Sequence, residues 1–144
     1  MKTTRSVARV VAALFIGSGL LSEMAQAHDT ATGETVTVAA DEPIPHLPEK
    51  RLVAHVVDYE PGASSAAHHH PRSAFIYAYV VSGAIRSKVG DDPARIYRAG
   101  EAWFENPGSY HRVSENASDT EPARLLAVLV VDGPDEQLVI PDTE

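Results

Sequence analysis

The sequence predicts an all-β fold, a single sandwich or barrel domain. Short runs rich in valine, isoleucine, tyrosine and phenylalanine follow one another from residue 51 onward, and these residue types favour the pleated, half-buried surface of a strand. Turn-forming residues separate the runs about every 8 to 12 positions, a spacing typical of small sandwiches and barrels. Helical periodicity is absent after residue 27, which agrees with the same fold class.

Residues 1–27 are predicted to be a cleaved signal peptide. Three basic residues precede an apolar stretch over residues 10–21, and the tripeptide Ala-Gln-Ala that ends at Ala27 matches a cleavage site. The apolar stretch is shorter than the roughly 20 residues of a spanning helix. We therefore expect export to the periplasm or the medium, without stable membrane insertion. An uncleaved amphipathic anchor is the alternative.

The charge of the chain limits its partners. It contains 12 Lys and Arg against 20 Asp and Glu, a net charge of −8, and loss of the signal peptide would remove three basic residues and one acidic residue to leave −10. Nucleic acids and anionic membranes attract basic surfaces, so we expect neither as a partner. The absence of cysteine excludes disulfides and thiolate metal sites.

Residues 28–50 are predicted to be a flexible N-terminal arm that precedes the domain. Residues 35–38 alternate polar and apolar side chains and predict one short strand within it. Pro43, Pro45 and Pro48 follow, and proline cannot donate a hydrogen bond to a sheet. We therefore expect residues 41–48 to be extended and unpaired.

Residues 51–140 are predicted to form the domain. Its apolar runs end at turn signals such as Pro61-Gly62, Ser82-Gly83 and Pro107-Gly108. Residues 124–131 are a continuous apolar run, as expected for a strand buried on both faces. The expected strands cover residues 52–59, 74–81, 84–89, 94–97, 101–105, 111–114, 124–131 and 137–140, the last as an edge strand.

Three consecutive histidines, His68, His69 and His70, are the first candidate for a functional site. In an extended chain successive side chains point to opposite faces, so His68 and His70 project together and His69 projects away. A further histidine, His111, follows the turn at Pro107-Gly108. Neutral imidazole binds zinc, iron, nickel and copper, so convergence of His68, His70 and His111 would make a metal site. The alternative is a solvated histidine loop and an unrelated surface histidine.

Two segments resemble the sequence motifs of the cupin family. Segment 62–83 begins with glycine, continues after five residues with the three histidines and ends with glycine, and it resembles the first motif. Segment 100–111 resembles the second motif: glycine, five residues, Pro-x-Gly, two residues and histidine. The resemblance implies a single-domain jelly-roll barrel, or double-stranded β-helix. It also implies that His68, His70 and His111 bind a divalent transition metal, which is iron, zinc, manganese or nickel.

The chain departs from the first motif at its glutamate. Counting forward from His70 places this glutamate at Ala74 or Phe75, and counting back from Gly83 places it at Ile76. None of these side chains can bind a metal. A site of three histidines carries no charge of its own, so a divalent ion would keep its full charge and favour an anionic ligand. The resemblance does not exclude such a site, because the family includes three-histidine iron centres in thiol dioxygenases.

Glu105 is the candidate to replace the missing glutamate, as a fourth ligand or as a catalytic acid or base. It alternates with Trp103, and in the cupin pattern both positions face into the barrel. We also expect Trp103, Tyr77 and Arg72 to lie at the substrate pocket, where Arg72 would hold an anionic substrate. The alternatives are a rim position for Glu105, core packing for the two aromatic residues and a solvated loop for Arg72.

The sequence leaves the function open between several classes. The first is an exported metal-dependent cupin enzyme, an oxidoreductase such as a dioxygenase that acts on a small organic substrate. The second is a periplasmic cupin that binds a metal or a small molecule without catalysis, and the third is an interaction module with vestigial histidines. In the first two classes the partner is a small molecule. The resemblance and the exposed edges of open β folds also predict a homodimer.

Overall fold

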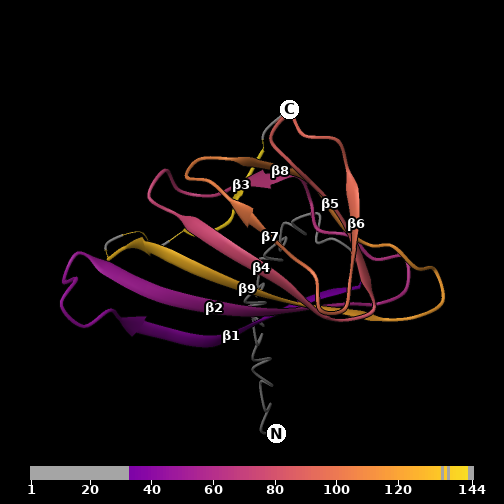
Figure 1. Cartoon of the computed structure of the whole chain (residues 1–144), viewed down its shortest axis with the longest axis horizontal. Coiled ribbons are helices and arrows are strands. Elements are labelled where there is room, and N and C mark those ends of the chain that lie inside the picture. The colour runs from indigo at the N-terminus through magenta and orange to yellow at the C-terminus, as the bar shows by residue number, and fades with distance from the viewer. Residues whose placement is uncertain (1–32, 134, 136, 143–144) are drawn as a thin grey trace, which may run out of the picture.

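The structure, a computed structural model, describes residues 33–133, 135 and 137–142 of the 144. These residues form strands and turns without a helix (Figure 1), and the all-β prediction is confirmed. No helix among them is long and apolar enough to cross a membrane. The predicted signal peptide, residues 1–27, and residues 28–32 of the predicted arm lie outside the described residues. In chain order the strands are β1 (Glu34–Pro43), β2 (Lys50–Tyr59), β3 (His68–His69), β4 (Phe75–Ser82), β5 (Ala84–Val89), β6 (Arg95–Arg98), β7 (Ala102–Glu105), β8 (Tyr110–Asn116), β9 (Ala123–Asp132) and β10 (Ile140–Pro141).

Two five-stranded antiparallel sheets make up the jelly roll. The first has the order β1-β2-β9-β4-β7 and the second has the order β10-β3-β8-β5-β6. Strands β4 and β5 are consecutive in the chain but belong to different sheets, so the chain changes sheet at Gly83. The strand at residues 124–131 was expected to be buried, and β9 does lie inside its sheet between β2 and β4.

The core lies between the sheets and follows the alternation of side chains along each strand. On β4, Ile76, Ala78 and Val80 are buried, whereas Phe75 and Tyr77 are exposed. One cluster of buried side chains includes Val80 and Trp103, and another includes Ile76. Burial of these apolar side chains between the sheets is the main stabilising contribution in a chain without disulfides.

Strand β1 is longer than the sequence predicted. It pairs with β2 from Glu34 opposite Tyr59 to Pro43 opposite Arg51, so much of the predicted flexible arm is a paired edge strand. Proline is compatible with this position because an edge strand has one side that needs no hydrogen-bond donor. A register shift between Val38 and Ala40 further adjusts the pairing.

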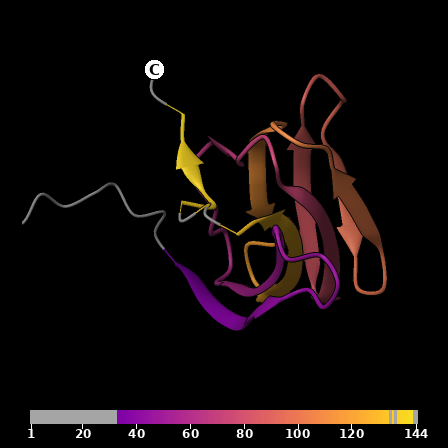
Figure 2. The ribbon, with the colours of Figure 1, turned by 90° about the vertical axis from the view of Figure 1, so that its left-hand side faces the viewer.

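The short strands β3 and β10 were not predicted in this form. Strand β3 contains only His68 and His69, and β10 pairs with it through Ile140 and Pro141. In Figure 2, β1 (indigo) and β10 (yellow) lie on the same side of the molecule. Both strands contribute residues to the cavity described below.

Candidate metal centre

The three candidate ligands come from neighbouring strands of the second sheet. His68 on β3 lies opposite His111 on β8, and residues directly opposite in an antiparallel pair point to the same face. His70 follows His68 by two residues and shares that face. All three side chains are buried. His69 points away from them, and its Nδ1 lies 2.8 Å from Asp142 Oδ1.

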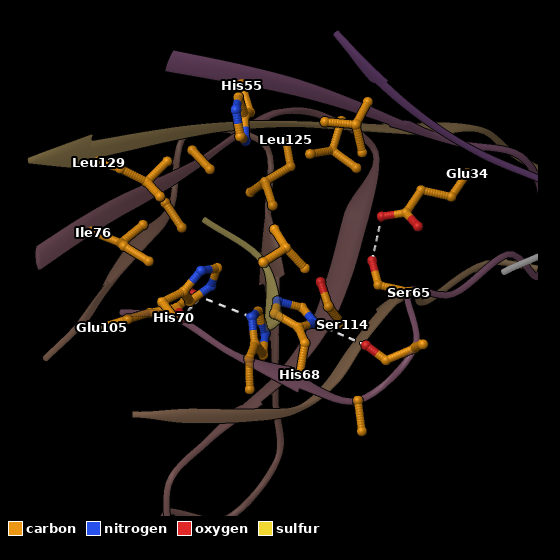
Figure 3. A pocket seen from close by; sticks show the side chains of 18 of the residues that line it. Glu34, His55, Ser65, His68, His70, Ile76, Glu105, Ser114, Leu125 and Leu129 are labelled. Carbon is orange, nitrogen blue, oxygen red and sulfur yellow. Dashed lines mark hydrogen bonds and ion pairs between the residues drawn. The ribbon is translucent and has the colours of Figure 1, made fainter. Parts of the chain in front are cut away.

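The three imidazole rings lie close enough to share one ion. The ring centroids of His68 and His70 are 4.9 Å apart and those of His68 and His111 are 5.1 Å apart; Figure 3 shows the first pair at one side of a cavity. One ligand atom from each histidine lies within 4.8 Å of the others. Metal–nitrogen bonds are about 2.0–2.1 Å long, so small side-chain rotations bring the three nitrogens to coordination distance.

Backbone carbonyls determine which nitrogen is free on two of the rings. His68 Nδ1 lies 2.8 Å from the carbonyl oxygen of Ala66, and His70 Nδ1 lies 2.6 Å from that of Leu138. A carbonyl oxygen only accepts hydrogen bonds, so each Nδ1 carries the proton and each Nε2 keeps its lone pair. This arrangement is common for metal-binding histidines.

Glu105 lies against two of the three histidines, His70 and His111. Its Oε2 is 3.5 Å from His70 Nε2 and its Oε1 is 3.3 Å from His111 Nδ1. Trp103 Nε1 donates a 3.0 Å hydrogen bond to Oε1, whereas the buried Oε2 has no hydrogen-bond partner among the described residues. An unpaired buried carboxylate oxygen is costly, and a cation held by the imidazoles would satisfy it. The donor set therefore fits a divalent transition metal.

Burial sets the protonation of these groups. It lowers the pKa of His70 to about 4 and that of His111 to about 3, and neighbouring histidines add to both shifts. Burial raises the pKa of Glu105 to about 7, although the hydrogen bond from Trp103 opposes this shift. Both histidines are thus neutral, the metal-binding form, at neutral pH.

In space, Glu105 lies next to a residue at the position where the first motif has its glutamate. Ile76, one of the three residues that the motif count allows, pairs directly with Glu105 across β4 and β7. Both side chains are buried and point into the sandwich. The expectation that Glu105 faces the interior together with Trp103 is confirmed.

A cavity of about 420 Å³ opens beside the histidines. His68, His70, His111 and Glu105 line one part of it, as Figure 3 illustrates for three of them. Small and branched apolar side chains form much of the remaining wall; they include Val57, Ile76, Ala78, Leu125, Ala127 and Leu129. Its size and its apolar lining are suited to a small organic molecule.

Tyr77 does not line this cavity, contrary to the expectation for the pocket. It lies on the outer face of β4, 37% exposed, with its ring 5.3 Å from that of Phe104. Both faces of residues 75–80 are apolar, so the sequence pattern alone could not determine which face points inward. The smaller side chains of Ile76 and Ala78 face the cavity instead.

Trp103 and Arg72 are also outside the cavity lining. Trp103 is buried in the core, where its ring packs 4.6 Å from that of Tyr97. It contributes to the site by its hydrogen bond to Glu105 and by an edge-on contact with His111, whose ring centroid is 6.3 Å away. Arg72 lines a separate surface hollow that shares His70 with the main cavity. The expectation that these two residues line the substrate pocket is therefore wrong for this cavity.

Several polar residues of the cavity were missed in the sequence. His55 on β2 faces it, and burial lowers the pKa of this histidine while Asp41 opposes the shift. Tyr59, Ser65 and Ser114 form a connected group of hydroxyls. No motif marks these residues, since only the pairing of distant strands brings them together.

Solved structures of other proteins have a similar fold. KdgF from Halomonas sp. matches with a TM-score of 0.56 and 21% identity, over 72% of this chain and 85% of that protein. An uncharacterized conserved protein with a double-stranded β-helix domain from Klebsiella pneumoniae matches with a TM-score of 0.57 and 20% identity, over 80% and 90%. Oxalate decarboxylase from Bacillus subtilis matches with a TM-score of 0.55 and 26% identity, over 72% of this chain but only 28% of that protein.

No curated protein matches the chain in sequence. The family model for the cupin domain, in contrast, matches residues 55–129, which is just over half of the 144 residues. The match includes the three clustered histidines, Glu105 and most of the apolar cavity wall. The jelly-roll fold and this match agree, and the chain belongs to the cupin domain family.

Proposed function

We propose that the protein is a divalent-metal-dependent enzyme that acts on a small organic substrate in the cavity beside the histidines. One observation carries the proposal: three buried imidazoles and a buried carboxyl group converge at the wall of a largely apolar cavity. Buried titratable groups with shifted pKa values beside an accessible cavity are characteristic of functional sites.

His68, His70 and His111 would hold the metal, which is iron, zinc, manganese or nickel. A bound divalent ion would act as a Lewis acid on a substrate oxygen, and iron would in addition support reaction with O₂. Because the three imidazoles bring no charge, this end of the cavity would favour an anionic substrate group. An oxidoreductase such as a dioxygenase is one activity compatible with this arrangement.

Glu105 is the acid or base of the proposal. A proton acceptor is most effective when its pKa lies near the working pH, and in the metal-free chain burial raises the pKa of Glu105 to about 7. Trp103 orients its Oε1 by a hydrogen bond, and the carboxyl group would exchange a proton with a substrate from a position beside the bound ion. The apolar walls would exclude water from this exchange.

A non-catalytic metal or ligand carrier is the second candidate function. Ile76 in place of the motif glutamate favours it, because the site then lacks the second charged group that the first motif provides. The names of the structural neighbours do not decide between the two, since identities near 20% support the fold alone. Turnover is the property that separates the candidates.

The test compares His68→Ala with His69→Ala in the full-length chain after expression and purification. Elemental analysis should find about one transition-metal ion per wild-type and His69→Ala chain, and a large loss in His68→Ala, because His68 points into the cavity and His69 points away from it. A chelator should abolish turnover in a screen of small organic acids with O₂ consumption and product formation as readouts. Metal without turnover supports the carrier, and equal metal content in both variants overturns the metal site itself.

A further inference from the structure

A chain of hydroxyl groups crosses the cavity wall away from Glu105. Ser65 Oγ donates a 2.5 Å hydrogen bond to Glu34 Oε1. Tyr59 OH lies 2.6 Å from Ser65 Oγ and 2.8 Å from Ser114 Oγ. All four residues line the cavity, and Tyr59 and Ser114 are buried. In Figure 3, Glu34 and Ser65 lie on the opposite side from Glu105, with Ser114 between.

The carboxylate of Glu34 fixes the direction of every hydrogen bond in this row of hydroxyl groups. A carboxylate only accepts, so the single proton of Ser65 points to Glu34. Ser65 Oγ must then accept from Tyr59, whose only proton is thereby used. Tyr59 OH must in turn accept from Ser114. Burial raises the pKa of Tyr59 to about 12, so the tyrosine keeps this proton at neutral pH.

The consequence is a polar cavity end that can only accept hydrogen bonds. Ser114 has used its proton on Tyr59 and offers only lone pairs to the cavity. A ligand hydroxyl or amine can donate to it, whereas a ligand carboxylate would meet lone pairs and the nearby negative charge of Glu34. The opposite polarity is expected at the histidine end, where a bound cation favours an anion.

We propose that Ser114 and Tyr59 form a specificity subsite that binds a hydroxyl or amino group of a small organic acid whose acidic end lies at the histidines. The position of the acidic end rests on the proposed function. The donor preference at Ser114 rests on the hydroxyl chain alone. The apolar walls between the two ends would contact the carbon skeleton of the ligand.

The test uses straight-chain carboxylates of three to six carbons that end in a methyl, hydroxyl, amino or second carboxylate group. Binding to the zinc-loaded full-length protein is measured by calorimetry. At the best-fitting length, the hydroxyl- or amino-ended acid should bind about tenfold more tightly than the methyl-ended acid, as expected for one added hydrogen bond. The dicarboxylate should bind most weakly. Comparison of the hydroxyl-ended acid with the amino-ended acid establishes which donor group the subsite prefers.

Glu34→Gln tests the directional argument. The amide can donate to Ser65, which frees the chain to reverse and lets Ser114 donate, so the preference for a donor over a carboxylate should fall to about threefold or less. Glu42→Gln, on the same strand but exposed and outside the cavity lining, should keep the wild-type preference. Thermal unfolding establishes that both variants are folded.

The outcomes separate this inference from the proposed function. Equal affinity for all end groups, an unchanged preference in Glu34→Gln or no binding of any probe overturns the subsite. If the protein binds no zinc but still prefers hydroxyl- or amino-ended probes, the subsite stands and the metal proposal fails. If zinc binds through the histidines without any end-group preference, the metal proposal stands and the subsite fails.

Discussion

At the scale of single residues, Glu105 combines a stability cost with a binding role. It is 3% exposed and has only one hydrogen-bonded oxygen among the described residues. Its pKa of about 7 in the folded chain lies above the ordinary value of 4.5. The folded state therefore holds this proton more tightly than the unfolded state does. The stabilising contribution is complete below pH 4.5 and is lost as the pH rises through 7.

Glu105→Gln should consequently have opposite effects in the metal-free and metal-loaded protein. Without metal, wild type should lose about 3 kcal/mol of its free energy of unfolding between pH 4.5 and pH 8 relative to the variant. The reason is that each pH unit between the pKa of Glu105 in the unfolded chain and its pKa in the folded chain is worth about 1.4 kcal/mol. With saturating zinc at pH 8 the variant should gain less stability than wild type. Urea unfolding with and without zinc measures both, and parallel pH profiles would contradict the role of Glu105.

Histidine alternation shows what residue-level reasoning can predict. The spacing of His68 and His70 predicted that they share a face, and their burial together with His111 agrees with this. The metal identity does not follow from the residues, because imidazole binds several ions. The hydrogen-bonded hydroxyl groups were not predictable either, because they join Glu34 on β1 to Ser114 on β8, which are far apart in the sequence.

At the scale of elements, Gly83 determines how the chain passes from one sheet to the other. It lies between β4 and β5 with φ of +70°, a conformation that other residues adopt at a cost. An added Cβ would lie 2.6 Å from the carbonyl oxygen of Pro122 and 2.9 Å from Cα of Ala123, at the start of β9. The close approach of two backbones explains why the second glycine of the motif-like segment occupies this corner.

Gly83→Ala should therefore destabilise the fold far more than Gly90→Ala. Gly90 also has a positive φ, +59°, but a Cβ there would meet no atom within 4 Å, so only the backbone cost of about 1 kcal/mol applies. Gly83→Ala adds a clash with backbone atoms and should cost about 3 kcal/mol or more. Chemical denaturation of both variants measures the difference, and equal losses would rule out the steric explanation.

The end of a strand could be predicted from the sequence where a turn motif directly follows it. The ends of β2 and β4 lie at Pro61-Gly62 and Ser82-Gly83, as expected. Strand β1 extends further than predicted because its prolines lie at or beyond the end of an edge pairing. The inward face of β4 was not determined by pattern, since the choice between Tyr77 and Ile76 depends on packing across the sandwich.

At the scale of the whole molecule, the outer face of the first sheet is an apolar surface without a partner in the described chain. Phe104 is 60% exposed, and its ring stacks 5.6 Å from that of Phe75 and lies 5.3 Å from that of Tyr77. Val128 and Val130 continue this face on β9, directly opposite Tyr77 and Phe75. Exposed apolar patches of this kind mark interaction sites.

We propose that a second copy of the chain covers this patch, as the resemblance also implied. The five residues of the patch carry no charge, so two chains with a net charge of −8 can meet there without like charges at the centre of the contact. Two identical sheet faces can pack about a two-fold axis with their strands roughly aligned. The proposed interface lies on the outside of the sheet whose inner face lines the cavity.

Phe104→Lys should convert the dimer to a monomer because it places a charge at the centre of the patch, twice across the two-fold axis. Ile96→Lys is the matched control: Ile96 is 47% exposed but lies on β6 in the other sheet. Sedimentation velocity over a range of concentrations should find dimers for wild type and Ile96→Lys and mainly monomers for Phe104→Lys. A wild-type protein that sediments as a monomer at every concentration, or dimers that survive in Phe104→Lys, would assign the patch a different role.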